Sequence, residues 1–293
     1  MSLETDRAEL AYLPTSLGEP VEVMRVSYRR QSFPRHSHDY YTIGVMLGGR
    51  GTMWYRGAEH LSVAGDVVLI PPGEIHTGEV ARDADVFSYL ALHAPPSLVA
   101  AAAAENGMAE GAVAAFRSPV IRDGAIAAAL CRLGALMKSK DVSAIDDLLT
   151  QLIGALVTPA LADSHSPTLP PFVRRAMSII EASYADPTRT SLLALSRSTG
   201  VTPFHLVREF TASTGLSPHR YLVQTRVRRA CELLSTGMSV SLVAASTGFA
   251  DQSHLTTQFK RYVGMTPAAY GSARVITSQG ASADDEVRRA TPP

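Results

Sequence analysis

The chain has 293 residues, of which 46% are hydrophobic and 18% charged, so it can bury a sizeable core and is not globally disordered. Its formal net charge of zero hides an asymmetry, because residues 1–170 hold 13 Lys and Arg against 19 Asp and Glu, whereas residues 171–275 hold 12 against 5. This asymmetry suggests that only the C-terminal third meets a polyanion, and the alternative is a chance segregation of surface charge.

Length and composition also set the expected class of protein. A chain of this length suggests two domains. No segment approaches the continuous apolar run that a membrane span needs, and the N-terminus is acidic and polar, so we expect a cytoplasmic protein without a membrane partner. Cys131 and Cys231 lie far apart within helical patterns, which predicts two buried free thiols and no disulfide.

The first part of the chain, from Val21 to His93, is predicted to form strands. Its segments are short, rich in β-branched and aromatic residues, and separated by Gly, Pro and Asp turns. They read VEVMRVSY, YYTIGVML, GTMWYRG, GDVVLIPPG and DVFSYLAL. Strands of this length and spacing are typical of a small barrel or sandwich.

Two histidine motifs lie in this region. The segment GDVVLIPPGEIH, from Gly65 to His76, fits the second cupin motif, G-x5-P-x-G-x2-H, and His36-Ser37-His38 fits the beginning of the first. The region therefore resembles a cupin barrel over about residues 20–93. The Glu that follows H-x-H in the cupin pattern is missing, because Thr42 and Ile43 stand at the expected place.

The cupin resemblance implies that His36, His38 and His76 converge inside the barrel. Three imidazoles can bind a metal such as Zn²⁺ or Ni²⁺, but the missing Glu weakens that reading, and we expect no obligatory cofactor. A pocket for a small-molecule effector at the barrel mouth is the preferred interpretation. The expected lining is His36, His38, Tyr40, Trp54 and His76, with Trp54 equally compatible with an ordinary core position.

After Ser97 the composition changes to Ala and Leu. The segments DGAIAAALCRLGALMKSK and SAIDDLLTQLIGALVTPALA carry apolar residues at helical spacing. We expect these helices to pair two chains into a homodimer, and the alternative is that they only cap the barrel. The apolar residues concerned are Ile126, Leu130, Leu133, Leu148, Leu152 and Leu156.

A Pro- and Ser-rich linker, DSHSPTLPP, leads into a helical region that contains a repeat. The first copy runs from Ser191 to Tyr221 and the second from Ser239 to Tyr270. Gly200 corresponds to Gly248, an offset of 48, and the later matches all have an offset of 49, so the second copy has one extra residue after its glycine.

Each copy has the signals of a helix-turn-helix unit. Gly200 and Gly248 supply the left-handed residue that ends one helix and turns the chain. Thr202 and Asp251 are suitable N-caps for the next helix. Pairs at i and i+4, Leu206 with Phe210 and Leu255 with Phe259, point to the core, which leaves the opposite face for a partner. The segment HRYLVQTRVRRACELL is long enough to be a rigid spacer between the copies.

Residues 172–270 closely resemble the DNA-binding domain of the AraC/XylS family. The family pattern near its second unit is G-F-x-D-x-S-x-(F/L)-x-x-x-F-K-x-x-x-G-x-(T/S)-P-x-x-Y. The matching residues here are Gly248, Phe249, Asp251, Ser253, Leu255, Phe259, Lys260, Gly264, Thr266, Pro267 and Tyr270. The resemblance implies seven helices with two helix-turn-helix units, whose second helices enter successive major-groove segments of double-stranded DNA.

The same resemblance implies which side chains contact DNA. Arg208 suits guanine, and Gln252 suits adenine. Lys260 is expected at phosphate, as are Arg226, Arg228, Arg229 and Arg261 unless they only solvate a helix face. Thr257 stands where the family often has an arginine, so direct readout by the second unit is expected to be weaker. The full DNA-contacting set is Thr202, Phe204, Val207, Arg208, Thr211, Asp251, Gln252, Ser253, Thr256, Thr257 and Lys260.

The sequence therefore predicts a non-enzymatic, effector-responsive transcription regulator that binds promoter DNA, with RNA polymerase as a further candidate partner. Its fold class is an all-β cupin-like barrel with following α-helices, then an all-α domain of two helix-turn-helix units. The expected division is 1–95 barrel, 96–162 helical dimerisation or packing segment, 163–171 linker, 172–275 DNA-binding domain and 276–293 disordered tail. The alternatives are a cupin metalloenzyme fused to a DNA-binding module and an effector-independent DNA-binding protein.

Overall fold

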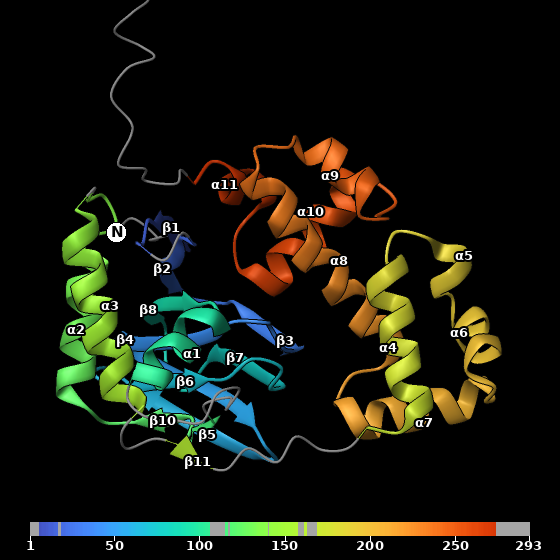
Figure 1. The fold of residues 1–293 in the computed structure, drawn as a ribbon, viewed down its shortest axis with the longest axis horizontal. Coiled ribbons are helices and arrows are strands. Elements are labelled where there is room, and N and C mark those ends of the chain that lie inside the picture. Colours follow the sequence, from blue (N-terminus) through green and yellow to red (C-terminus); the bar gives the residue numbers. More distant parts are fainter. Residues whose placement is uncertain are drawn as a thin grey trace, which may run out of the picture.

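The computed structural model describes residues 6–16, 19–105, 115–116, 118–139, 141–157, 161–162 and 169–273. A β-rich N-terminal part and a helical C-terminal part lie side by side (Figure 1). Most of the predicted linker, residues 163–168, and all of the predicted tail lie outside the described residues. Over the described ranges, no helix has both the length and the apolar character that crossing a membrane requires.

The N-terminal part is an antiparallel barrel, as the sequence predicts. One sheet has the order β1-β2-β8-β4-β6-β10, and β4 continues into a second sheet with β5 and β7, where β7 also pairs with β3. A short pair, β9 with β11, stands apart. The strands are β1 (Arg7–Leu13), β2 (Val21–Tyr28), β3 (Ser32–His36), β4 (Tyr41–Tyr55), β5 (Ala58–Val63), β6 (Val67–Ile70), β7 (His76–Val80), β8 (Phe87–Ala94), β9 (Ala115–Phe116), β10 (Val120–Ile121) and β11 (Leu161–Ala162).

Strand β4 corrects the strand prediction. The two segments YYTIGVML and GTMWYRG, expected as separate strands, form one strand of 15 residues that is shared by both sheets. The pairing with β8 shifts register between Met46 and Gly48, and Gly49 has a φ of 72°. A Cβ at Gly49 would overlap the carbonyl oxygen of Val86. The glycines therefore bend the strand around the barrel without ending it.

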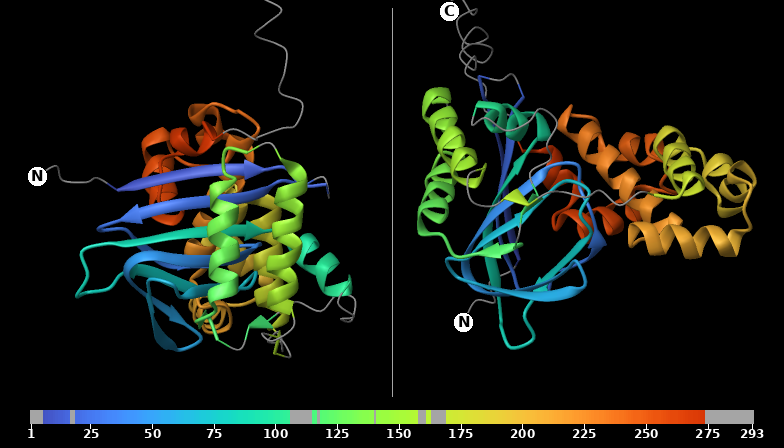
Figure 2. Two further views of the ribbon diagram at one scale, coloured as in Figure 1. Left: turned by 90° about the vertical axis from the view of Figure 1, so that its left-hand side faces the viewer. Right: turned by 60° about the horizontal axis from the view of Figure 1, so that its bottom comes forward.

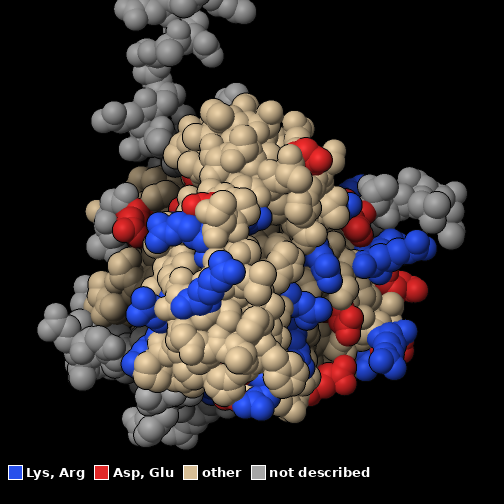
Figure 3. Space-filling view, turned by 90° about the vertical axis from the view of Figure 1, so that its right-hand side faces the viewer, with Lys and Arg blue, Asp and Glu red and all other residues tan. Residues whose placement is uncertain are grey.

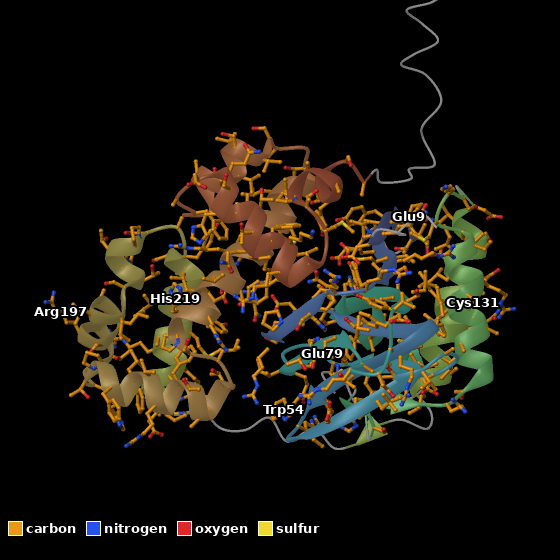
Figure 4. All side chains as sticks on the ribbon, turned by 180° about the vertical axis from the view of Figure 1, so that it is seen from behind. Glu9, Trp54, Glu79, Cys131, Arg197 and His219 are labelled. Atoms are coloured by element: carbon orange, nitrogen blue, oxygen red, sulfur yellow. The ribbon has the colours of Figure 1, made fainter. Side chains whose placement is uncertain are left out.

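Helices α1 (Pro96–Glu105), α2 (Gly124–Ala135) and α3 (Val142–Val157) follow the barrel, and α2 and α3 lie across one face of the larger sheet (Figure 2). Five of the six apolar residues that suggested chain pairing are at most 3% exposed, and Leu148 packs against the same core. They pack against the outer face of the sheet within one chain, which is the alternative that the sequence left open, and the pairing of two chains stays a prediction. Cys131 is also exposed on the outer side of α2 (Figure 4), which corrects the expectation of two buried thiols.

The C-terminal part contains both predicted helix-turn-helix units. Helices α6 and α7 form the first, α9 and α10 form the second, and α8 joins them (Figure 1). Gly200 and Gly248 have φ values of 74° and 76°, and Thr202 and Asp251 accept hydrogen bonds as N-caps. The bounds are α4 (Pro171–Ser183), α5 (Pro187–Thr190), α6 (Leu192–Thr199), α7 (Pro203–Thr214), α8 (Pro218–Ser235), α9 (Val240–Ser246), α10 (Gln252–Val263) and α11 (Pro267–Gly271).

The two units have different cores. Leu206 and Phe210 of the first unit pack with α4, α6 and α8, in a cluster made entirely of C-terminal residues. Leu255 and Phe259 of the second unit belong to a cluster that also contains barrel side chains, Tyr28 among them. The barrel therefore carries α2 and α3 on one face and the second unit on another side (Figure 2).

Candidate functional site

The second helix of each unit has an exposed face. On α7, the side chain of Phe204 is 76% exposed, which is unusual for a large apolar group that has no partner to cover it. The Arg208 side chain is 59% exposed, and its Nε lies 2.9 Å from an Oε of Glu209 on the same helix. Its terminal nitrogen lies 3.2 Å from Nδ1 of His205. Arg208 is therefore exposed and in contact with two neighbours on the same helix.

On α10, the corresponding face carries shorter polar side chains. Gln252, Ser253, Thr257 and Lys260 are exposed and Thr256 is half-buried. The Thr257 hydroxyl donates to the carbonyl oxygen of Ser253 at 3.0 Å, so its methyl group is the part left for a partner. The structure thus brings the predicted residues together as two separate surface patches, one on each unit.

The surface around the first unit carries unpaired positive charge. Lys and Arg side chains are spread across this side of the molecule, and Asp and Glu side chains lie mostly toward its edges (Figure 3). Within residues 169–273, Arg174, Arg175 and Arg197 are exposed and have no ion pair. Arg197 projects from α6 away from the barrel (Figure 4). Such free guanidinium groups suit phosphate contacts.

Arg228 differs from the expectation of a phosphate contact. It lies on α8, and its terminal nitrogen donates to the two carboxylate oxygens of Glu181 at 2.6 and 2.7 Å. Its Nε lies 3.1 Å from Asp39 of the barrel. Burial opposes its charge, but the hydrogen bond with Glu181 and the charge of Asp39 outweigh burial and raise the pKa of Arg228. Arg228 is therefore an internal link between the two parts of the chain.

A cavity of about 220 Å³ lies between the barrel and the C-terminal helices. Barrel strands and the loop after β3 supply most of its wall. Helices α8, α10 and α11 supply the rest, with Gln224, Val227, Arg228, Cys231, Tyr262, Val263 and Tyr270. Next to it, Gln224 exchanges hydrogen bonds with the backbone of Ser37, at 3.2 Å and 2.6 Å. The cavity is thus closed by the domain that carries the two exposed helices.

Three predicted histidines line this cavity. The ring centroids of His36 and His76 are 4.2 Å apart, and those of His38 and His76 are 5.0 Å apart. Each Nδ1 lies within hydrogen-bond distance of a backbone carbonyl, at 2.8 Å for His36, 2.7 Å for His38 and 3.0 Å for His76. Because a carbonyl only accepts, each Nδ1 carries the proton and Nε2 carries the lone pair in the neutral ring.

Burial is the main influence on these rings. Burial, followed by the neighbouring imidazoles, holds the pKa of His38 and of His76 well below the ordinary value, and burial also lowers the pKa of His36. The rings are therefore neutral at neutral pH. Among the described residues, no group of three or more His, Cys, Asp or Glu side chains is placed to hold a metal ion.

One buried carboxylate reaches from the barrel to the C-terminal domain. Glu22 of β2 accepts a hydrogen bond from the hydroxyl of Tyr270 at 2.7 Å, and its other oxygen lies 2.6 Å from Nδ1 of His93. Burial raises the pKa of Glu22, but the hydrogen bonds from His93 and Tyr270 outweigh it and the net shift is downward. Glu22 is therefore ionised and already has two partners.

Four of the five residues expected at the effector site line the cavity and the fifth does not, and their role in binding an effector stays a prediction. His36, His38, Tyr40 and His76 line the cavity, but Trp54 does not. Its neighbour Met53 does, and successive residues of a strand point to opposite faces. The Trp54 ring instead lies under the guanidinium of Arg35, 4.1 Å from the ring centroid.

Sequence reasoning missed the cavity residues that come from outside the cupin motifs. Glu22 and His93 face each other across the β2–β8 pairing, and no local sequence pattern predicts this pairing. Tyr270 was noted only as part of the repeat. A signal was present, because a Glu near the beginning of the apolar strand VEVMRVSY requires a partner if it is buried.

Comparisons with known proteins agree with this layout. A family model described as an AraC-like ligand binding domain matches residues 20–156, and one described as a helix-turn-helix domain matches residues 195–273. An uncharacterized HTH-type transcriptional regulator of Bacillus subtilis, YbfI, is 30% identical over 239 residues, covering 80% of this chain and 86% of the relative. The HTH-type transcriptional activator RhaS of Escherichia fergusonii is 26% identical, covering 85% and 91%.

Solved structures share the two-part fold. ToxT from Vibrio cholerae, in a structure with an unsaturated fatty acid bound, has a TM-score of 0.55 at 13% identity and covers 95% of this chain and 98% of its own. An apo structure of a ToxT variant has a TM-score of 0.53 at 14% identity, covering 92% and 97%. At these identities the likeness concerns the fold.

Proposed function

The chain belongs to the AraC family of helix-turn-helix transcription regulators, and we propose that α7 and α10 enter successive major-groove segments of promoter DNA. The observation that carries this proposal is the pair of exposed faces on two equally capped helices, one with Phe204 and Arg208 and the other with Gln252 and Thr257. Arg208 would contact guanine and Gln252 adenine, and the free arginines near α4 and α6 would contact phosphates.

Selection of duplexes from a random pool by the full-length chain tests this proposal. We expect an enriched sequence with two short conserved blocks about one helical turn apart, because each unit reads one groove segment. Arg208→Ala should remove the preference at one base pair within one block, and Arg197→Ala is the control that should weaken all sequences equally. A pool without enrichment over several rounds would contradict the proposal.

The cavity is the second element of the proposed function, as the site of a small-molecule effector. Its walls come from the barrel and from α8, α10 and α11, so a ligand there touches both domains. A ligand that binds two relative arrangements of the domains unequally shifts their populations and hence the affinity for DNA. The fatty acid bound in the ToxT structure supports a ligand-binding role for this fold.

The metal, the dimer and the remaining partners stay proposals. Any Zn²⁺ or Ni²⁺ bound by the three histidines would be adventitious, and elemental analysis of the purified chain should give well under one metal per protein. We propose that a homodimer pairs through surfaces other than the apolar faces of α2 and α3, because those faces are buried on the barrel. Sedimentation of the full chain tests pairing. We further propose a cytoplasmic, non-enzymatic regulator that contacts RNA polymerase.

A further inference from the structure

The charged groups that line the interdomain cavity are already occupied. Glu22 has His93 and Tyr270 as partners, and Arg228 has Glu181 and Asp39. Among the described residues that line the cavity there is no lysine, and Arg228 is the only arginine. An anionic ligand would therefore meet no free cation, and a carboxylate buried without a partner is strongly disfavoured.

The polar atoms that remain available are neutral. His76 is 6% exposed and lines the cavity, and among the described residues its Nε2 has no hydrogen-bond partner. Tyr40 and Tyr89 also line the cavity, and their hydroxyls have no hydrogen-bond partner within the described residues. A neutral imidazole nitrogen accepts a hydrogen bond, and a phenol both donates and accepts. These groups suit a ligand that brings a hydroxyl or amide of its own.

The remaining surface is aromatic and apolar. The rings of His38 and Tyr40 stack with centroids 4.3 Å apart, and Tyr40 stacks on His93 at the same distance. Phe33, Phe87 and the residues of β4 add apolar wall. A dry cavity of about 150 Å³ is enough for benzene, so a volume of about 220 Å³ suits one substituted ring.

We propose that the cavity takes an uncharged, single-ring aromatic molecule with a hydrogen-bond donor, held by His76, Tyr40 and Tyr89, and that it discriminates against carboxylates. This inference rests on the proposed effector role of the cavity. The proposed ligand therefore differs from the fatty acid bound in the ToxT structure, because a cavity lining without a free cation disfavours the binding of a carboxylate.

Calorimetric titration of the full-length chain with three probes of similar shape tests the inference. At neutral pH, 4-ethylphenol should bind about fivefold more tightly than ethylbenzene, the size of one net hydrogen bond. The anion 4-ethylbenzoate should bind at least about a hundredfold more weakly than 4-ethylphenol. Equal or tighter binding of the benzoate would overturn the inference, and so would absence of binding by all three.

Variants locate the effect. His76→Phe removes the accepting nitrogen and keeps a ring, so the advantage of 4-ethylphenol over ethylbenzene should fall to less than about twofold while ethylbenzene binding persists. His60→Phe is the matched control, because His60 lies on β5 and does not line the cavity. An unchanged ratio in a folded His76→Phe chain would remove His76 from the site. DNA selection without any probe reports separately on the DNA-binding function, so the two proposals can fail independently.

Discussion

The two copies of the repeat share a sequence pattern but occupy different surroundings. The first copy packs within the C-terminal domain, and the second shares a core with the barrel. One pair of corresponding tyrosines shows this difference in surroundings. Tyr221 donates to Glu181 of α4 at 2.9 Å, whereas Tyr270 donates to Glu22 of the barrel at 2.7 Å. The corresponding tyrosine therefore makes a hydrogen bond within the C-terminal domain in the first copy and a hydrogen bond to the barrel in the second.

The glycines that follow the two exposed helices differ in how closely they approach the barrel. Gly215 and Gly264 have φ values of 71° and 84°, so both conformations favour glycine. A Cβ at Gly215 would meet the flexible side chain of the barrel residue Ile75 at 3.3 Å, a tolerable contact, whereas a Cβ at Gly264 would overlap the hydroxyl of the buried Tyr28. The second copy thus lies directly against the barrel, and we expect changes in the cavity to reach it first.

The largest expected effect comes from breaking that contact. Gly215→Ala should cost about 1–2 kcal/mol of unfolding free energy from backbone strain alone. Gly264→Ala should cost about 1–3 kcal/mol more, because the new methyl group displaces Tyr28. Urea unfolding of the two variants measures the difference. Equal losses of unfolding free energy in the two variants would show that Gly264 is not in close contact with Tyr28 in solution.

The paired tyrosines give the next effect. Tyr270→Phe and Tyr221→Phe each remove one hydrogen bond to a carboxylate, worth about 1.5–3 kcal/mol. We expect similar losses of stability, but only Tyr270→Phe should speed hydrogen exchange in α10 and α11. If Tyr221→Phe has the same effect on those helices, the Glu22 contact is not what holds the second copy to the barrel.

Corresponding positions on the exposed helices sharpen the comparison for DNA. Arg208 aligns with Thr257, so the first copy has a guanidinium where the second has a methyl group. Arg208→Ala should weaken binding to the selected duplex by about 1–3 kcal/mol and relax the preference at one base pair. Thr257→Ala should cost less. Equal weakening of selected and random DNA by Arg208→Ala would reassign Arg208 to phosphate.

The smallest expected effect concerns Lys260 and its counterpart Thr211. Lys260→Ala should weaken all duplexes alike and reduce the slope of log affinity against log salt by about one unit. Thr211→Ala should leave the slope unchanged, because a threonine hydroxyl carries no charge and displaces no counterion. Affinities measured at several salt concentrations check both. A slope unaffected by Lys260→Ala would place this lysine away from the phosphates.

Much of the molecule follows from local sequence signals. The positions of Gly200, Thr202, Gly248 and Asp251 predicted both helix-turn-helix units, because each conformation depends on a residue and its near neighbours. The cupin motifs predicted the barrel and the convergence of His36, His38 and His76, and these three histidines line one cavity. Where the prediction was wrong or left an alternative open, long-range packing decided. The apolar pattern of α2 and α3, for example, does not indicate whether these helices cover a sheet or a second chain.

The sequence by itself determined the two kinds of domain, the turn and cap residues and the exposed face of each reading helix. Only the tertiary structure decided that Arg228 points inward to Glu181 and Asp39, that Trp54 lies outside the cavity, and that Glu22 meets Tyr270. The reason is physical. Capping and helical periodicity depend on residues within one turn, whereas the partner of a buried charge is chosen by packing between segments, here 248 residues apart in the chain.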